Sequence, residues 1–130
     1  MLILALHTGN EVSELYLYKD NNELESITWL AHRQLADTIH IKIEQLLKDN
    51  GFDWNNIEGL AVFKGPGSFT GLRIGMTVAN ALALGLNIPI VAKSGDAWCN
   101  EAIKALLGGE NEKVVTPEYG GEANITLPKK

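Results

Sequence analysis

The densest group of residues that could do chemistry lies in a glycine-rich segment, Lys64–Gly75. Glycines on both sides of Pro66 let the backbone turn sharply, and Ser68 and Thr70 both favour the first position of a helix. A helix N-terminus beside glycines presents free amides and binds anions readily. The segment therefore predicts a motif loop in contact with an anion or a nucleotide, made of Gly65, Pro66, Gly67, Ser68, Phe69, Thr70, Gly71 and Arg73.

The same segment lacks the details of two well-known nucleotide-binding motifs. The Walker pattern requires Gly-Lys-Ser/Thr, but Gly71 is followed by Leu72. The glycines also lack the spacing of the dinucleotide fingerprint. By pattern alone, a tight strand-to-helix turn is therefore favoured over a nucleotide-binding loop.

Histidines and nearby carboxylates supply few further candidates. His32 and His40 are eight residues apart on one face of a predicted helix, about 12 Å along its axis, which is too far for one metal ion. A triad of Ser68, His7 and Asp96 has no supporting motif. The single cysteine of the chain excludes an intrachain disulfide and any multi-cysteine zinc site. We therefore predict neither a metal nor a cofactor.

The elements that would position these residues change from strands to helices along the chain. Three runs of strand-forming residues, with a turn at 19–22, predict an antiparallel meander, and helical periodicity follows it. The predicted strands are 2–6, 12–18, 24–30, 57–63 and 90–92. The predicted helices are 31–50, closed by Gly51, then 70–86, and a third that Ser94 or Asp96 caps and that ends at Leu107.

This order, β-β-β-α-β-α-β-α, predicts an α/β fold with a mixed sheet and helices on its faces. The layout resembles a ribonuclease-H-like domain, the half-unit of the actin-like and sugar-kinase (ASKHA) folds. The 130 residues are enough for one domain. We assign residues 1–109 to that domain and residues 110–130 to an extended C-terminal tail.

Charge and hydropathy narrow the class of protein further. There are 11 Lys and Arg against 16 Asp and Glu, and the net charge of -5 disfavours direct binding of a nucleic-acid backbone. No apolar run approaches the ~20 residues of a membrane span, and no basic stretch precedes residues 2–6 as in a signal peptide. These features predict a cytoplasmic protein without membrane contact.

The predicted second helix is small on one side. Its glycines and alanines recur every fourth residue from Gly71 to Ala83. Because glycine in a helix costs about 1 kcal/mol relative to alanine, such a stripe indicates close approach by another element. Apolar residues around the rest of the helix predict burial by a second chain. The predicted partner interface is Leu35, Ile39, Ile43, Leu46, Leu72, Gly75, Met76, Ala79, Leu82 and Ala83. Within it we expect the partner at the helix 35–46 and the protein's own sheet at Gly75.

The sequence from Gly65 to Val91 resembles the TsaB (YeaZ) family. The shared features are Gly-Pro-Gly-Ser-Phe-Thr-Gly-Leu-Arg-Ile-Gly at 65–75, Leu-Ala-Leu-Gly at 82–85 and Ile-Pro-Ile-Val at 88–91. The resemblance covers about residues 1–107, lacks the family's second subdomain and returns at 117–119 and 124–126. His7 stands where the family usually has an aspartate. The chain thus resembles an internally shortened member.

The resemblance implies a role in making threonylcarbamoyladenosine at position 37 of tRNA. Family members are non-catalytic relatives of the transferase subunit TsaD and pair with it through their first two helices, and the ATPase TsaE joins them. For this chain it implies a scaffold with no catalytic residue, a TsaD-like and a TsaE-like partner, a homodimer when alone and only indirect tRNA contact. Residues 93–99 also lack the transferase's histidine pair. The alternative is a nucleotide hydrolase or a glycoprotease-like peptidase that uses Gly65–Gly71.

Overall fold

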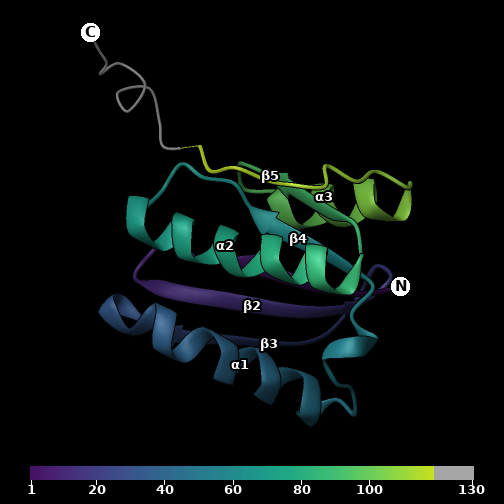
Figure 1. Ribbon diagram of the computed structural model, residues 1–130, viewed down its shortest axis with the longest axis horizontal. Coiled ribbons are helices and arrows are strands. Elements are labelled where there is room, and N and C mark those ends of the chain that lie inside the picture. The colour runs from purple at the N-terminus through teal and green to yellow at the C-terminus, as the bar shows by residue number, and fades with distance from the viewer. Residues whose placement is uncertain (119–130) are drawn as a thin grey trace, which may run out of the picture.

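The computed structural model describes residues 1–118, which form a mixed five-stranded sheet with helices on both faces (Figure 1). The strand order is β3-β2-β1-β4-β5. The strands are β1 (Leu2–His7), β2 (Val12–Lys19), β3 (Asn22–Leu30), β4 (Gly59–Phe63) and β5 (Ile90–Lys93). The helices are α1 (Leu35–Asp49), α2 (Phe69–Leu86) and α3 (Trp98–Leu107), with short 3-10 turns η1 (His32–Gln34) and η2 (Trp54–Asn56). The predicted α/β class, mixed sheet and element order are confirmed.

The central strand, β1, is apolar along its length because it is buried on both faces of the sheet. All of its residues, Leu2–His7, are buried. It pairs antiparallel with β2, where Leu4 lies opposite Leu17, and parallel with β4, where Leu4 lies beside Leu60. A strand in this position has no solvent-facing side, so its sequence shows no alternation of polar and apolar residues.

Alternate strand residues divide the core into two layers. One face packs beneath α1 and α2 in a large aliphatic cluster that includes Leu4, Leu6, Leu15, Leu17, Ile39, Ile43 and Leu60. The opposite face packs beneath α3 in a smaller cluster that includes Ile3, Ala5, Ala61, Val91, Trp98 and Ile103. Two helices therefore cover one face of the sheet and a single helix covers part of the other (Figure 1).

The first helix begins later than its periodicity predicts. Residues His32–Gln34 form η1, in which His32 has a φ of 50°, and α1 starts only at Leu35. The prediction that His32 and His40 share one helix face is therefore wrong. With this left-handed backbone His32 lies outside α1, and its Nδ1 is 3.6 Å from a carboxylate oxygen of Glu11.

The C-terminal ends of α1 and α2 agree with the sequence, whereas the start of α3, like that of α1, does not. Gly51 follows α1 with a φ of 81°, as predicted, and Asn87 caps α2 with a φ of 56°. Neither Ser94 nor Asp96 caps α3, which begins at Trp98 without a side-chain hydrogen bond. Burial of the Trp98 side chain against the sheet holds the first turn of α3 instead.

α2 is long and apolar enough, by length and composition alone, to cross a membrane, which the runs in the sequence did not predict. In this structure its inner side belongs to the core, where Leu72, Met76 and Ala79 are buried. The core helix of a soluble protein passes the same test of length and composition, so one such helix is a weak indication of a membrane span.

After α3 the chain runs along the outer edge of β5. The side chain of Asn111 accepts a hydrogen bond from the Ile90 N–H, and the carboxylate of Glu112 accepts one from the Ala92 N–H, both at 3.1 Å. The backbone N–H of Glu112 in turn donates to the Ile90 carbonyl at 2.9 Å. We call residues 111–115 the edge strap.

The edge strap is also tied to α2. The side chain of Asn80 donates to the carbonyl of Val115 at 3.0 Å and accepts from its N–H at 2.9 Å. The chain from residue 110 to residue 118 contains no helix. The remainder of the predicted tail, including most of the C-terminal resemblance, lies outside the described residues.

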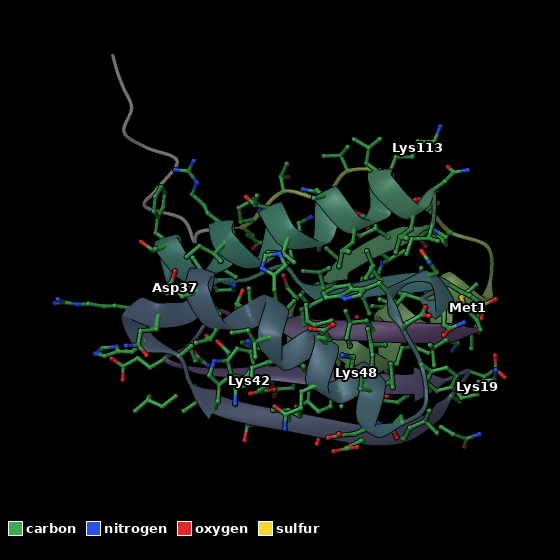
Figure 2. All side chains as sticks on the ribbon, turned by 60° about the horizontal axis from the view of Figure 1, so that its bottom comes forward. Met1, Lys19, Asp37, Lys42, Lys48 and Lys113 are labelled. Carbon is green, nitrogen blue, oxygen red and sulfur yellow. The ribbon has the colours of Figure 1, made fainter. Side chains whose placement is uncertain are left out.

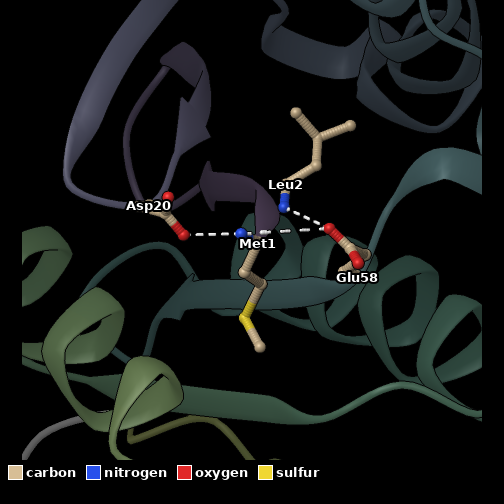
Figure 3. A network of polar contacts seen from close by, with 4 residues as sticks. All are labelled: Met1, Leu2, Asp20 and Glu58. Carbon is tan, nitrogen blue, oxygen red and sulfur yellow. Dashed lines mark hydrogen bonds and ion pairs between the residues drawn. The ribbon is translucent and has the colours of Figure 1, made fainter.

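A polar network joins three segments at one end of the sheet (Figure 3). The amino group of Met1 forms an ion pair with Asp20 and lies 4.0 Å from Glu58, which also accepts the Leu2 N–H at 2.8 Å. The hydrogen bond from this ammonium group, with its charge, lowers the pKa of Asp20. The network fixes the start of β1 between the β2–β3 turn and the approach to β4.

Candidate functional site

The glycine-rich loop lies at the carboxyl end of β4 and packs against the turn that follows β1. The N–H of Ser68 donates to the carbonyl of Gly9 at 2.8 Å, and the Thr8 hydroxyl donates to the carbonyl of Gly71 at 2.8 Å. Ser68 caps α2 as predicted, since its hydroxyl accepts the Gly71 N–H at 3.3 Å. These bonds make the two turns a single unit.

At three glycines in and beside this unit there is no room for a side chain. A Cβ on Gly71 would lie 2.2 Å from the Thr8 carbonyl oxygen, and one on Gly75 would lie 2.2 Å from the Thr8 hydroxyl oxygen. A Cβ on Gly67 would lie 2.8 Å from the carbonyl oxygen of Gly9. The small stripe thus lets α2 approach the protein's own β1–β2 turn, and Gly75 faces Thr8 of that turn rather than the sheet.

The other residues of the predicted motif loop divide between packing and exposure. Gly65 is buried, and a Cβ there would lie 2.2 Å from the carbonyl oxygen of Glu118. The positions from Pro66 to Thr70 are exposed. The Arg73 guanidinium lies 5.3 Å from the centre of the Phe69 ring, in cation–π geometry. The main role of the loop is therefore structural: it connects β4 to α2, packs against the turn after β1 and leaves its outer positions exposed.

The residues predicted to contact a partner lie mostly inside the protein. All of them except Leu82 are buried: Leu35, Ile39, Ile43, Leu46, Leu72, Gly75, Met76, Ala79 and Ala83. Two helices share one face of the sheet, so each needs a full apolar stripe for that contact alone. This burial corrects the predicted interface, because a partner that touches α1 and α2 must use their outer sides.

The outer sides of α1 and α2 form a groove of about 470 Å³ that the sequence analysis missed. It is lined by Ala36, His40, Phe69, Thr70, Arg73, Ile74, Thr77 and Val78. Large apolar side chains on the same helices remain in water: Ile41 is 63% exposed, Phe69 56% and Leu84 85%. The sequence signal for this groove is the four-residue spacing of Phe69, Arg73 and Thr77, which places them on one side of α2 as a second stripe of mixed polarity.

A second cavity, of about 390 Å³, opens on the α3 face at the carboxyl ends of the strands. In its wall the ring of His7 stacks on Phe63 at 3.7 Å, and the ring of Trp98 meets His7 edge-on at 5.7 Å. The N–H of Gly9 donates to Nδ1 of His7 at 3.2 Å. Burial lowers the pKa of His7, although the charge of Glu14 opposes the shift. His7 is a packed, neutral imidazole near pH 7.

The structure does not bring Ser68, His7 and Asp96 together as a triad. His7 and Asp96 line the cavity on the α3 face, whereas Ser68 lines a different cavity at the start of α2. No three His, Cys, Asp or Glu side chains in this part of the chain lie close enough to hold a metal. Burial raises the pKa of Cys99 to about 11, which makes its thiol a poor nucleophile at neutral pH.

Comparison with known proteins connects this half-domain to tRNA modification proteins. The family model described as "TsaD: tRNA N6-adenosine threonylcarbamoyltransferase" matches residues 28–102, more than half of the chain. The "tRNA threonylcarbamoyladenosine biosynthesis protein TsaB" of Haemophilus influenzae is 35% identical over 112 residues, which are 85% of this chain and 47% of that protein. The chain belongs to the TsaB (YeaZ) family.

Other TsaB relatives and a solved structure agree. The TsaB protein of Bacillus subtilis is 37% identical over 95 residues, 72% of this chain and 41% of that protein. The structure of YeaZ from Pseudomonas aeruginosa superposes with a TM-score of 0.66 and 31% identity, over 72% of this chain and 43% of the other. The chain therefore spans less than half the length of the TsaB relatives, and it shares with them the ASKHA-type half-domain described above.

Proposed function

We propose that this protein is a non-catalytic scaffold subunit in the synthesis of threonylcarbamoyladenosine on tRNA, and that it binds a TsaD-like transferase. The relatives in Haemophilus influenzae and Bacillus subtilis are named for this biosynthesis. The observation that carries the proposal is the groove between α1 and α2. The inner sides of both helices are used by the core, whereas Ile41 on α1 and Leu84 on α2 are exposed and can contact another chain.

The groove has the form that a helix of a partner protein would fill. Two rigid helices make its walls, and a partner helix with apolar residues at intervals of three or four would pack against Ala36 and Ile74. A second copy of this chain would use the same surface when no transferase is present. The homodimer and the transferase complex therefore exclude each other, and a TsaE-like ATPase joins the latter.

The absence of catalysis is supported by what occupies the key positions. His7 ends β1 where the family usually has a carboxylate, and a buried neutral imidazole cannot hold Mg²⁺ as a carboxylate does. The glycines of the loop accommodate the protein's own backbone. Contact with tRNA is indirect, since the net charge is -5 and the labelled lysines belong to three different parts of the chain, with Lys19 on β2, Lys42 and Lys48 on α1 and Lys113 in the edge strap (Figure 2).

Binding to the TsaD-like transferase of the same cell tests the proposal. Thr77 is exposed in the groove, so Thr77→Arg should leave the fold intact and weaken binding by about tenfold or more, measured by calorimetry. Glu101→Arg introduces the same side chain at an exposed position of α3 and should leave the affinity unchanged. Circular dichroism of both variants checks folding.

Two results would contradict the proposal. Equal loss of affinity in Thr77→Arg and Glu101→Arg would remove the groove from the interface. Hydrolysis of ATP by the purified chain with Mg²⁺, abolished by Thr70→Ala in the loop, would favour the nucleotide hydrolase and overturn the non-catalytic role.

A further inference from the structure

A cavity of about 280 Å³ lies at the N-terminal end of α2, between the turn after β1 and η1. It adjoins the proposed partner surface, with which it shares Thr70 and Ile74, but its lining is more polar and also includes Ser13, Ser68, Glu11, His32 and Arg33. The scaffold role does not account for this collection of donors, of which Ser68 and Thr70 belong to the predicted motif loop. Three independent features of the cavity point to the same class of ligand.

The first feature is a buried hydroxyl without a partner. Ser13 is 0% exposed, and its Oγ is the only buried side-chain nitrogen or oxygen within residues 1–118 that makes no hydrogen bond. Its side chain lies on the α1/α2 face of β2, as do those of Leu15 and Leu17, and Ser13 forms part of the cavity floor. A buried donor left unpaired is unfavourable, so the cavity offers a hydroxyl that a ligand oxygen would satisfy.

The second feature is the start of α2. An 18-residue helix carries a partial positive charge at its N-terminus, where its first amides have no helical acceptor. The Gly71 amide is weakly bonded to the Ser68 hydroxyl at 3.3 Å. The Thr70 amide has no hydrogen-bond acceptor among residues 1–118, and Thr70 is one of the residues that line the cavity.

The third feature is the charge at the rim. Arg33 lines the cavity and is in no ion pair within the described part of the chain. Glu11 also lines it, but its carboxylate lies 3.6 Å from Nδ1 of His32, held there by the left-handed turn at His32. The arginine is therefore the charge left for a ligand, and its planar donors suit a tetrahedral oxyanion.

We propose that this cavity binds a phosphate group, carried by inorganic phosphate or by a small phosphate monoester. The Thr70 amide, the Ser13 hydroxyl and the Arg33 guanidinium supply its donors. A volume of about 280 Å³ accommodates a phosphate with a small substituent. A polyanion is disfavoured because Glu11 stands at the rim and the whole chain is acidic. The site is independent of the scaffold role.

Amide chemical shifts of the full chain, followed by NMR, test the proposal with three probes: inorganic phosphate, a nucleoside monophosphate and the matching nucleoside. Shifts rather than melting are measured because phosphate stabilises proteins in general. We expect saturable shifts at Ser13, Thr70 and Gly71 with a dissociation constant of about 1–10 mM for phosphate. The nucleoside should leave these amides unmoved, and tighter binding of the monophosphate than of phosphate would identify a monoester as the ligand.

Matched arginine variants separate this site from general charge effects. Arg33→Gln should weaken phosphate binding by about tenfold, whereas Arg73→Gln, in the neighbouring groove, should leave it unchanged. Ser13→Ala should also weaken binding while the free protein melts at the same or a higher temperature, since an unpaired hydroxyl is removed. The proposal is overturned by equal losses in both arginine variants, by absence of saturation at about 50 mM phosphate, or by tighter, Arg33-dependent binding of single-stranded RNA.

Discussion

The two strand-to-helix turns on the parallel side of the sheet, β4–α2 and β5–α3, have opposite designs. In the first, backbone and side chain of Thr8 and Gly9 lie where the Cβ atoms of three glycines would be, and Ser68 caps the helix. In the second, a Cβ on Gly95 would meet nothing within 4 Å, and α3 starts without a side-chain cap. The first turn is a packed joint, and the second leaves open the cavity beside His7.

The difference shows that glycine serves two separate purposes in this small domain. Around α2 it removes side chains so that one turn can approach another. At Gly95 the φ of 87° is what requires glycine, because side-chain-bearing residues rarely adopt it. Substitutions at the two turns should therefore lower the unfolding free energy for different reasons and by different amounts.

The largest effect is expected at the packed joint. Gly71→Ala places a methyl group 2.2 Å from the Thr8 carbonyl oxygen, a backbone atom that cannot rotate away. Separation of α2 from the β1–β2 turn should cost about 3 kcal/mol or more of unfolding free energy, measured by urea denaturation.

Gly85 of the same helix provides the matched control. A Cβ there meets nothing within 4 Å, so Gly85→Ala should stabilise the protein by up to about 1 kcal/mol through helix propensity. Loss of stability in Gly85→Ala similar to that in Gly71→Ala would mean that helix geometry, and not the joint, limits substitution.

A smaller effect is expected at the open turn. Gly95→Ala must hold an alanine at a φ of 87° but displaces no neighbour, so it should cost about 1–2 kcal/mol. Gly95→Asn should recover part of this loss, because asparagine tolerates left-handed backbone better than alanine does. Equal losses of unfolding free energy in the two variants would instead indicate a packing role of Gly95.

The smallest effect concerns pH at the cavity beside the open turn. Burial lowers the pKa of His7 below its ordinary value of 6.5, so the unfolded chain binds a proton more readily than the folded one. Stability should then fall as pH decreases below 6.5. The groups that face His7 are Glu14 from β2, Phe63 from β4 and Trp98 from α3.

Replacement of His7 isolates this contribution. His7→Gln should be less sensitive than the unaltered protein to a change from pH 7.5 to pH 5.5 in thermal melts. An unchanged slope in His7→Gln would assign the acid sensitivity to the carboxylates.

The sequence predicts the elements well where local chemistry decides them. Three features follow from the residues alone: the continuous apolar run of β1, the left-handed backbone at Gly51 and the N-terminal cap of α2 by Ser68. The delayed start of α1 does not, because His32 takes a left-handed conformation, which is uncommon for any residue other than glycine.

The candidate site could be predicted only in part. Periodicity identifies apolar stripes, but it does not say whether the sheet or a partner covers them, and here the sheet covers both Ile39 and Met76. The groove depends on how far apart α1 and α2 sit, and the phosphate cavity brings Ser13 and Thr70 together from distant parts of the chain. Such juxtapositions depend on tertiary structure rather than on spacing.

The edge strap has a consequence for how the protein behaves among copies of itself. A bare edge strand invites another strand to add to the sheet, which is a route to aggregation. On β5 the amides of Ile90 and Ala92 are already bonded to Asn111 and Glu112, so they cannot pair with a strand of another copy. At the opposite margin β3 carries the acidic side chains Glu23 and Glu25, which repel a like strand from another copy. A domain of this size thereby keeps its sheet at five strands.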